Sequence, residues 1–471
     1  MAMGKRRQRQ QQSLWIEERR LAQSPGHPFY ERLNKVLDDE GFDAFVEAEC
    51  SQFYSDRTGR PSLAPAVYFR LLLIGYFEGI DSERGIAWRV ADSLSLREFL
   101  GYELSDAPAD HSTISRNRRL IDLESHQAVF AWVVGVLAKR GLVRGKTLGM
   151  DSTTLEANAA LRSIVRRDSG ESYEEFLERL AKASGIETPT RQEMAKIDRK
   201  RSGKGSNKDW EHPHDPDARI TKMKDGRTHL AHKASHAVDM ETGAILGIQI
   251  DPATAGDTQT VDDLLAEVVD NLGQVLEVPE AAEQLSEALA AELVADKGYH
   301  SNAVLKSLRK MGIRTYISEP NRGRRNWKGK PGEKAATYEN RRRVKRAKGK
   351  ALLRRRGELV ERGFAHCYET GGMRRTHVRH HPNILKRLLV HVAGFNLGLV
   401  MRQAYGKGTP RGLQGSLATA FSYLRRLIVA LKLYPRRPDI RSRTLQQIIA
   451  RYTASGEATP RRREPGFATG C

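Results

Sequence analysis

Two aspartates stand where predicted strands give way to loops, a position that suits phosphoryl-transfer chemistry. Asp151 lies in the segment KTLGMDSTTLEAN, and Asp296 follows the apolar segment AELVA. Carboxylate oxygens are the ligands that hard cations such as Mg²⁺ prefer. Two such ions about 4 Å apart stabilise the attacking and the leaving oxygen of an in-line phosphoryl transfer. Because the two aspartates are far apart in sequence, this chemistry requires a fold that brings them together.

A third acid for such a site has to come from a helix that packs over the strand ends. The segment RRRGELVERGFAHCYETGGMRR offers two candidates, Glu358 and Glu361. The predicted buried stripe of this helix consists of Val360, Phe364, Cys367 and Tyr368. Glu361 flanks the stripe and is expected to point along the interface toward the sheet, whereas Glu358 lies a turn earlier and nearer solvent. Packed carboxylates repel one another, so such a cluster binds metal or has a raised pKa.

The elements around these acids predict an α/β fold. The predicted strands are residues 146–158, 228–239 and 244–251, a short strand that ends at Asp296, and 313–319. Hairpin-like links join the first three strands, and helices join the last two. This order predicts a ribonuclease H-like mixed five-stranded sheet flanked by helices, preceded by an all-α N-terminal domain. In that arrangement the first and fourth strands are neighbours, so Asp151 and Asp296 are expected to meet.

Changes in composition divide the 471 residues into four regions. The predicted regions are a basic, disordered arm at 1–27, a helical domain at 28–143, the α/β domain at 144–405, and a basic helix with a disordered tail at 406–471. An insertion at about 160–227 interrupts the α/β domain with a helix and a charged, glycine-rich stretch. Residues 320–350 are predicted to be a basic linker that leads to the helix carrying Glu361.

Positive charge dominates the chain. Lysine and arginine outnumber aspartate and glutamate by 79 to 58, which gives a formal net charge of +21 and a pI near 9.9. The excess is concentrated at 322–362, with 17 basic and 4 acidic residues, whereas 262–293 holds 9 acidic residues and no basic one. A surplus of this size favours a polyanionic partner, and DNA or RNA is the commonest.

Cysteine use and hydropathy indicate the compartment. The three cysteines are widely separated, which favours a reducing compartment and argues against a disulfide framework or a cysteine zinc site. The basic N-terminus lacks the apolar core of a signal peptide, and no apolar run approaches the roughly 20 residues that cross a bilayer. The expectation is a soluble, intracellular protein without a membrane partner.

One polar segment ahead of the sheet has the composition of a DNA-contacting helix. In DAPADHSTISRNRRLI, Asp110 is the predicted N-cap. Small hydroxyls, an amide and arginines in the first turns suit a helix laid in a DNA groove. The alternative is a solvated helix that packs through Ile114 and Ile121. The predicted DNA-contacting residues are Ser112, Thr113, Arg116, Asn117, Arg118 and Arg119.

Histidines raise the alternative of a zinc site. His229, His232 and His236 have ligand-like spacing, as do His212 and His214. Residues three apart on a strand point to opposite faces, so His229 and His232 do not readily share one ion. We therefore do not predict zinc at these histidines.

The chain resembles the DDE-type transposases of bacterial insertion sequences over roughly residues 30–405. The resemblance rests on the segments TLGMDSTTLEANA, DPDARITKMKDGRTHLAHKASHAVDMETGAIL, ELVADKGYHSN and GELVERGFAHCYETGGMRRTHVRHHPNILKRLLVHVAGFNLGLVMR. It implies a ribonuclease H-like core and a helical N-terminal domain that binds transposon ends or helps the protein dimerise. It also implies that Asp151, Asp296 and Glu361 are the catalytic triad and the ligands of two Mg²⁺ ions, for which Mn²⁺ substitutes.

The activity that the resemblance implies is Mg²⁺-dependent strand cleavage at transposon ends and strand transfer into target DNA. The implied partners are DNA, as terminal inverted repeats and as target, and a second copy of the chain in a homodimer. The implied location is the bacterial cytoplasm, at the nucleoid. Two alternatives remain open: a two-metal nuclease or resolvase that cuts without joining, and a transposase-derived DNA-binding protein that has lost catalysis.

The helix around Glu361 departs from a pattern common in related transposases, Tyr-x2-Arg-x3-Glu-x6-Lys. The tyrosine, arginine and lysine positions of that pattern are occupied here by Arg354, Gly357 and Tyr368. The triad is left in place, but the DNA-holding residues of the pattern are replaced. The basic residues predicted to contact DNA instead are Lys297, Arg355, Arg356, Arg362, Arg374 and Arg375.

Overall fold

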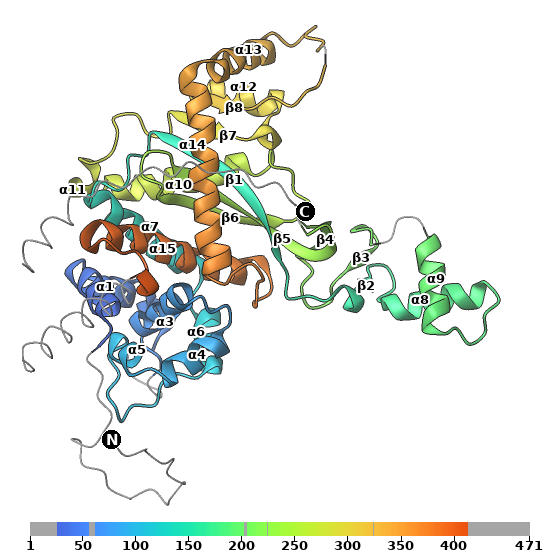
Figure 1. The fold of residues 1–471 in the computed structure, drawn as a ribbon, viewed down its shortest axis with the longest axis horizontal. Helices are drawn as coiled ribbons and strands as arrows, with labels where there is room; N and C mark the ends of the chain where they lie inside the picture. The colour runs from blue at the N-terminus through green and yellow to red at the C-terminus, as the bar shows by residue number, and fades with distance from the viewer. Residues whose placement is uncertain (1–25, 56–61, 202–204, 224, 324, 413–471) are drawn as a thin grey trace, which may run out of the picture. The chain divides into compact units, whose positions relative to one another are not determined.

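The structure is a computed structural model that describes residues 26–55, 62–201, 205–223, 225–323 and 325–412 (Figure 1). These residues belong to one compact unit. All but the last two residues of the predicted N-terminal arm, and most of the predicted C-terminal helix and tail, lie outside the described residues. The domain boundaries predicted inside this unit stay predictions.

Helices fill the described chain ahead of the sheet, as the helical spacing of the apolar residues predicts. They are α1 (Pro28–Asp39), α2 (Phe42–Cys50), α3 (Pro65–Glu78), α4 (Glu83–Ala91), α5 (Leu94–Phe99), α6 (His111–Leu120) and α7 (Leu123–Lys139), with a 3₁₀ turn, η2 (Ser51–Phe53). The predicted start of α6 is confirmed, because Asp110 accepts the backbone N–H groups of Ser112 and Thr113.

The central sheet has six strands among the described residues, one more than predicted. They are β1 (Thr147–Glu156), β4 (Arg219–Lys222), β5 (Thr228–Asp239), β6 (Ile245–Pro252), β7 (Glu292–Ala295) and β8 (Arg314–Ile317). The order is β4-β5-β1-β7-β8, with β6 also paired to β5. The five predicted strands form the mixed, ribonuclease H-like sheet. The additional strand, β4, comes from the predicted insertion and pairs with the first residues of β5, ahead of β6.

The register of β1 decides what lies at the centre of the sheet. β1 and β7 are parallel, with Met150 opposite Ala295, and β1 and β5 are antiparallel, with Asp151 opposite His236. β7 ends at Ala295, directly before Asp296, whereas β1 continues along β5 to Glu156. The two parallel strands therefore separate immediately beyond the Met150–Ala295 pair. The prediction that Asp151 lies where its strand ends is wrong, because Asp151 lies in the middle of β1.

Helices cover both faces of the sheet. α14 (Ala347–Phe364) crosses one face (Figure 1), where a Cβ on Gly149 would meet Arg356. α10 (Val261–Leu276) lies on the other face, where a Cβ on Gly247 would meet Val268. The remaining helices of this part are α11 (Pro279–Ala282), η4 (Lys297–Tyr299), α12 (Asn302–Lys310), the π-helix η5 (Ala365–Thr370) and α15 (His381–Tyr405).

The prediction of a linker at 320–350 is wrong for most of these residues. Its second half forms α13 (Pro331–Lys345) and the start of α14. Asn340 anchors α13 to the sheet, because its side chain accepts the Ile317 N–H at 3.0 Å and donates to the Ile317 carbonyl at 2.8 Å. The basic composition suggested a solvated linker, but a few buried residues on one face are enough to dock this helix.

The predicted insertion carries its own small core. It contains η3 (Leu161–Ser163), β2 (Val165–Arg166), α8 (Tyr173–Ala183), α9 (Arg191–Lys200) and β3 (Trp210–Glu211). β2 and β3 pair antiparallel, and Trp210 packs with Phe176 beneath them.

Among the described residues, α15 and its C-terminal extension to Gly412 make the single unbent helix with the length and hydropathy of a membrane span, and 94% of its apolar window is buried inside the protein.

Candidate active site

Asp151 and Asp296 lie side by side where β1 and β7 separate, each one residue beyond the Met150–Ala295 pair. Oδ1 of Asp296 accepts the Gly298 N–H at 2.8 Å, so Asp296 caps η4. Oδ1 of Asp151 accepts the Ser152 N–H at 2.8 Å. Burial raises the pKa of Asp151, and the charge of Asp296 acts in the same direction, against the opposing charge of Arg356. The carboxylates of Asp151 and Asp296 are therefore close enough to interact electrostatically.

Arg356 contacts this pair from α14. Its guanidinium donates to Oδ2 of Asp151 at 2.7 Å, and the residue is 8% exposed. The sequence predicted Arg356 to contact DNA phosphates. In this structure its guanidinium forms an ion pair with a carboxylate of the candidate site, and its contact with DNA stays a prediction.

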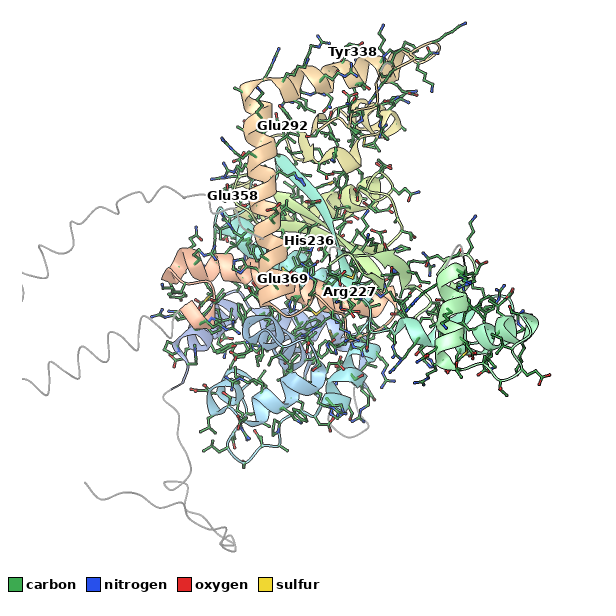
Figure 2. The ribbon with its side chains drawn as sticks, turned by 45° about the vertical axis from the view of Figure 1, so that its right-hand side comes forward. Arg227, His236, Glu292, Tyr338, Glu358 and Glu369 are labelled. Atoms are coloured by element: carbon green, nitrogen blue, oxygen red, sulfur yellow. The ribbon has the colours of Figure 1, made fainter. Side chains whose placement is uncertain are left out.

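The third predicted acid, Glu361, is not drawn into this contact. It is exposed on α14, beside the buried Val360, and within the described chain its carboxylate has no hydrogen-bond or ion-pair partner. Glu358, the other candidate (labelled in Figure 2), is also exposed. It pairs with Arg362 at 3.0 Å. Neither glutamate joins Asp151 and Asp296 in a group of ligating atoms within 4.8 Å of one another.

The sequence reasoning missed another acid, Asp257, in the loop between β6 and α10. Its Oδ2 lies 2.0 Å from the place that a Cβ on Gly298 would occupy, and Oδ1 of Asp296 lies 3.0 Å from the same place. Its Oδ1 pairs with the Lys233 ammonium at 2.5 Å. The sequence holds a weak signal for it, since Asp257 follows the predicted strand 244–251, but it also begins the segment DTQTVDDLLAEVVDNLGQVL, whose apolar spacing predicts an amphipathic helix.

Buried aromatic side chains line the sheet face beneath α14. His236 (labelled in Figure 2) lies opposite Asp151 in the sheet. Its Nε2 is 2.6 Å from the Tyr368 hydroxyl, and its ring packs against Phe364. Burial lowers the pKa of His236 to about 3, so its imidazole is neutral at pH 7. Tyr368 fills the lysine position of the related pattern, and here it closes a buried contact.

The predicted DNA-contacting residues of α6 divide into two groups. Ser112, Arg116 and Arg119 are exposed, and Thr113 is partly buried. Asn117 is 4% exposed and accepts a hydrogen bond from the Tyr54 hydroxyl at 3.1 Å. Arg118 is 8% exposed and donates to Glu83 at 2.7 Å. The last two side chains hold α6 to the rest of the helical region.

The other predicted DNA contacts lie around α14 and η4. The exposed members are Lys297, Arg355, Arg362 and Arg375. Arg374 is half-buried, pairs with Glu369 and donates to the Thr153 hydroxyl at 3.1 Å. Arg374 therefore lies over β1 two residues beyond Asp151.

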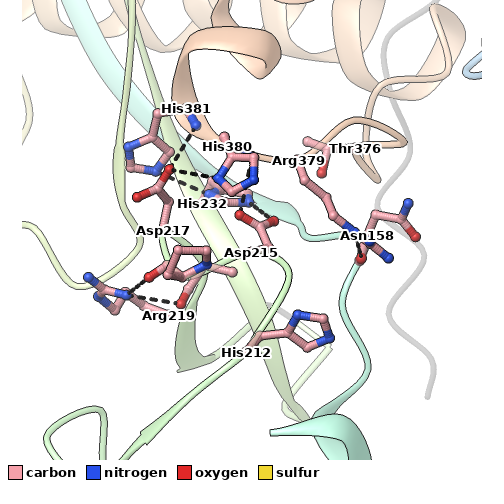
Figure 3. Close-up of polar contacts among 12 residues, drawn as sticks. Asn158, His212, Asp215, Asp217, Arg219, His232, Thr376, Arg379, His380 and His381 are labelled. Carbon is pink, nitrogen blue, oxygen red and sulfur yellow. Dashed lines mark hydrogen bonds and ion pairs between the residues drawn. The ribbon is translucent and has the colours of Figure 1, made fainter. Parts of the chain in front are cut away.

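A second group of acids and histidines lies at the start of α15 (Figure 3). Ligating atoms of Asp215, Asp217 and His380 lie within 4.8 Å of one another. Oδ1 of Asp215 accepts the His380 N–H at 3.3 Å, and Oδ2 of Asp217 accepts the His381 N–H at 3.0 Å (Figure 3). Oδ2 of Asp215 is also 3.3 Å from Nε2 of His232. Both carboxylates thus cap the positive N-terminus of α15, which accounts for their positions.

The donors where β1 and β7 separate fit a hard divalent cation. Asp151 and Asp296 offer carboxylate oxygens, the ligands that Mg²⁺ prefers. Asp257 places a third carboxylate nearby, but among the described residues the three do not form a group of ligating atoms within 4.8 Å of one another. Asp151 has a pKa raised by burial, and a cation at its carboxylate favours the ionised form. Asp151 and Asp296 are the residues that would hold such an ion.

Two known families match the chain. Residues 17–120 match a transposase domain (DUF772), and residues 206–397 match the transposase DDE domain, so together the two matches cover more than half of the sequence. The chain belongs to the DDE-type transposases. No curated protein and no solved structure matches it. This transposase is therefore a metal-dependent enzyme of phosphoryl transfer, and DNA is its substrate.

The family matches confirm the resemblance and the fold class inferred from the sequence. Asp296, Asp257 and Glu361 lie inside the segment that matches the transposase DDE domain. Asp151 lies between the two matched segments. Its assignment to the site therefore rests on its strand register beside Asp296.

Proposed function

We propose that this transposase cleaves DNA strands at the terminal inverted repeats of a transposon and transfers the freed 3′ ends into target DNA. Asp151, Asp296 and Glu361 are the proposed catalytic acids and the ligands of two Mg²⁺ ions, with Mn²⁺ as a substitute. The observation that carries the proposal is the register of β1 and β7, which pairs two carboxylates at the centre of the sheet. Bound divalent ions would stabilise charge on the attacking and leaving oxygens of an in-line transfer.

Asp151 and Asp296 form the preorganised part of the proposed site. Asp151 lies within a strand that is hydrogen-bonded on both sides, and Asp296 caps the turn that follows the neighbouring strand. Strand pairing fixes the backbone up to the Met150–Ala295 pair, immediately before both aspartates, which favours a preorganised cation site. The exact position of Asp296 also depends on the turn that it caps.

Glu361 has to move to join the two aspartates in the proposed site. It follows Arg356 by five residues on α14, so the two side chains are about 140° apart around the helix axis. A rotation of α14 that withdraws Arg356 from Asp151 also changes the direction of Glu361. We propose that Glu361 reaches the aspartates through such a rotation when DNA is bound.

The proposed DNA contacts are the basic residues around the two strand ends and on α6. Lys297, Arg355, Arg362 and Arg375 are exposed and carry charge that suits phosphates. The helical region at 28–143 is proposed to recognise the transposon ends and to join two copies in a homodimer that acts at the bacterial nucleoid.

The test is strand cleavage by the purified full chain on DNA that carries the transposon ends. Asp151→Ala, Asp296→Ala and Glu361→Ala are each expected to reduce Mg²⁺-dependent cleavage to background while end binding in a gel shift is retained. Glu358→Ala is the matched control and should keep activity. Loss of cleavage in Glu358→Ala but not in Glu361→Ala would transfer the third role to Glu358. Cleavage without joined products would identify a nuclease.

A further inference from the structure

The Asp257 carboxylate packs closely against the turn that carries Asp296. Its Oδ2 occupies the space beside Gly298 where any other residue would have its Cβ, at a distance of 2.0 Å. Oδ1 of Asp296 is 3.0 Å from the same point. The two carboxylate oxygens are thus no farther apart than the sum of these distances. Only glycine, which has no Cβ, leaves room for this contact at position 298.

Lys233 fixes the Asp257 side chain from β5. Its ammonium donates to Oδ1 of Asp257 at 2.5 Å and to the Ala255 carbonyl at 2.8 Å, both in the loop after β6. Lys233 is 5% exposed, so its charge has little access to water. A buried ammonium requires such partners, and removing one leaves an uncompensated charge. The contact is therefore a constrained link between the sheet and the loop.

The same turn is held at its other end by Tyr299. The Tyr299 hydroxyl is 2.6 Å from Oγ of Ser152, the residue after Asp151. Burial raises the pKa of Tyr299, and the charges of Asp257, Asp151 and Asp296 raise it further. The charges of all three carboxylates therefore act on this one hydroxyl. The turn from Asp296 to Tyr299 is fixed to β1 at one end and abuts Asp257 at Gly298.

We propose that Asp257, held by Lys233, is a positioning residue that sets Asp296 relative to Asp151 and thereby tunes the affinity for the divalent cation. A turn that contains glycine has wide conformational freedom, and the contact of the Asp257 carboxylate with Gly298 restricts it. Without the Asp257 carboxylate Asp296 can move, which weakens cation binding although both proposed ligands are still present. The inference rests on the proposed function, because it requires Asp151 and Asp296 to hold the ion.

The experiment measures Mn²⁺ binding to the metal-free full chain by titration calorimetry and, separately, the Mn²⁺ concentration for half-maximal cleavage. Asp257→Ala and Lys233→Met are each expected to weaken Mn²⁺ binding about 10-fold, as loss of outer-shell partners does. The cleavage rate at saturating Mn²⁺ should recover to near the wild-type rate. Asp262→Asn, an exposed acid at the start of α10, is the matched control and should leave the midpoint unchanged.

Gly298→Ala tests the contact from the other side, because its Cβ would displace the Asp257 carboxylate. It is also expected to weaken Mn²⁺ binding. A purely structural role would lower the melting temperature of these variants and leave the Mn²⁺ midpoint in place. A wild-type midpoint in both Asp257→Ala and Gly298→Ala, with binding abolished in Asp296→Ala, overturns the positioning role alone. Wild-type binding in Asp296→Ala overturns the proposed function together with this inference.

Discussion

The guanidinium of Arg356 donates to Oδ2 of Asp151 at 2.7 Å and so ties helix α14 to the central strand of the sheet. This contact places a positive charge on a carboxylate that is proposed to hold a divalent cation. The cation therefore has to compete with Arg356. The same helix carries Glu361, so release of Arg356 and movement of the proposed third acid are mechanically linked.

Replacing Arg356 should show both how much it stabilises the metal-free protein and how strongly it competes with the cation. In Arg356→Ala the partly buried Asp151 loses its partner, so the free energy of unfolding of the metal-free protein is expected to fall by about 1–3 kcal/mol. Because the competing charge is gone, Mn²⁺ should raise the melting temperature of the variant by more than it raises that of the wild type. Thermal unfolding with and without Mn²⁺ measures both quantities.

The matched control is Arg362→Ala on the same helix. Arg362 pairs with Glu358 at 3.0 Å in an exposed position, so its loss should change stability by less than about 0.5 kcal/mol. An equal Mn²⁺ response in Arg356→Ala and the wild type would show that Arg356 does not compete with the ion.

Two neighbouring arginines on α6 should behave differently when truncated. Arg119 is exposed, so Arg119→Ala is expected to weaken DNA binding and lower the salt dependence by about one unit of slope, with an unchanged melting temperature. Arg118 pairs with Glu83 where both side chains are mostly buried, so Arg118→Ala should destabilise the protein by about 1–3 kcal/mol. Binding titrations across salt concentrations and thermal unfolding measure the two effects. Identical behaviour of both variants would contradict this division of α6.

Stability should depend on pH through Glu267 of α10. Burial raises its pKa from 4.5 to about 8, although the Ile248 N–H and the Gln249 amide donate to it. Between these two values the folded protein retains a proton that the unfolded chain has released. The free energy of unfolding therefore falls as pH rises from about 4.5 to 8, by an amount on the order of several kcal/mol.

Glu267→Gln removes this proton exchange. Relative to the wild type, the variant should be more stable at pH 9 than at pH 5, as measured by denaturant unfolding at both pH values. Asp262→Asn on the same helix is exposed and should show no such difference. A constant difference between wild type and Glu267→Gln at both pH values would show that Glu267 stays ionised.

Local patterns in the sequence predicted the elements that build the site. The N-cap at Asp110, the strand that ends at Asp296 and the strand that contains Asp151 were all visible in short segments. The element order then predicted that β1 and β7 are neighbours. The linker prediction at 320–350 was wrong because composition reports charge, whereas the docking of α13 depends on a few buried residues such as Asn340.

The sequence by itself determined that Asp151 and Asp296 meet in a ribonuclease H-like sheet, because strand periodicity and connection order are encoded over short stretches of chain. Only the tertiary structure decided which side chains face those aspartates. Arg356 reaches Asp151 because of the rotation of α14 about its own axis, and Asp257 reaches Gly298 because of the path of a loop. Both are set by packing between segments distant in sequence, which no local pattern records.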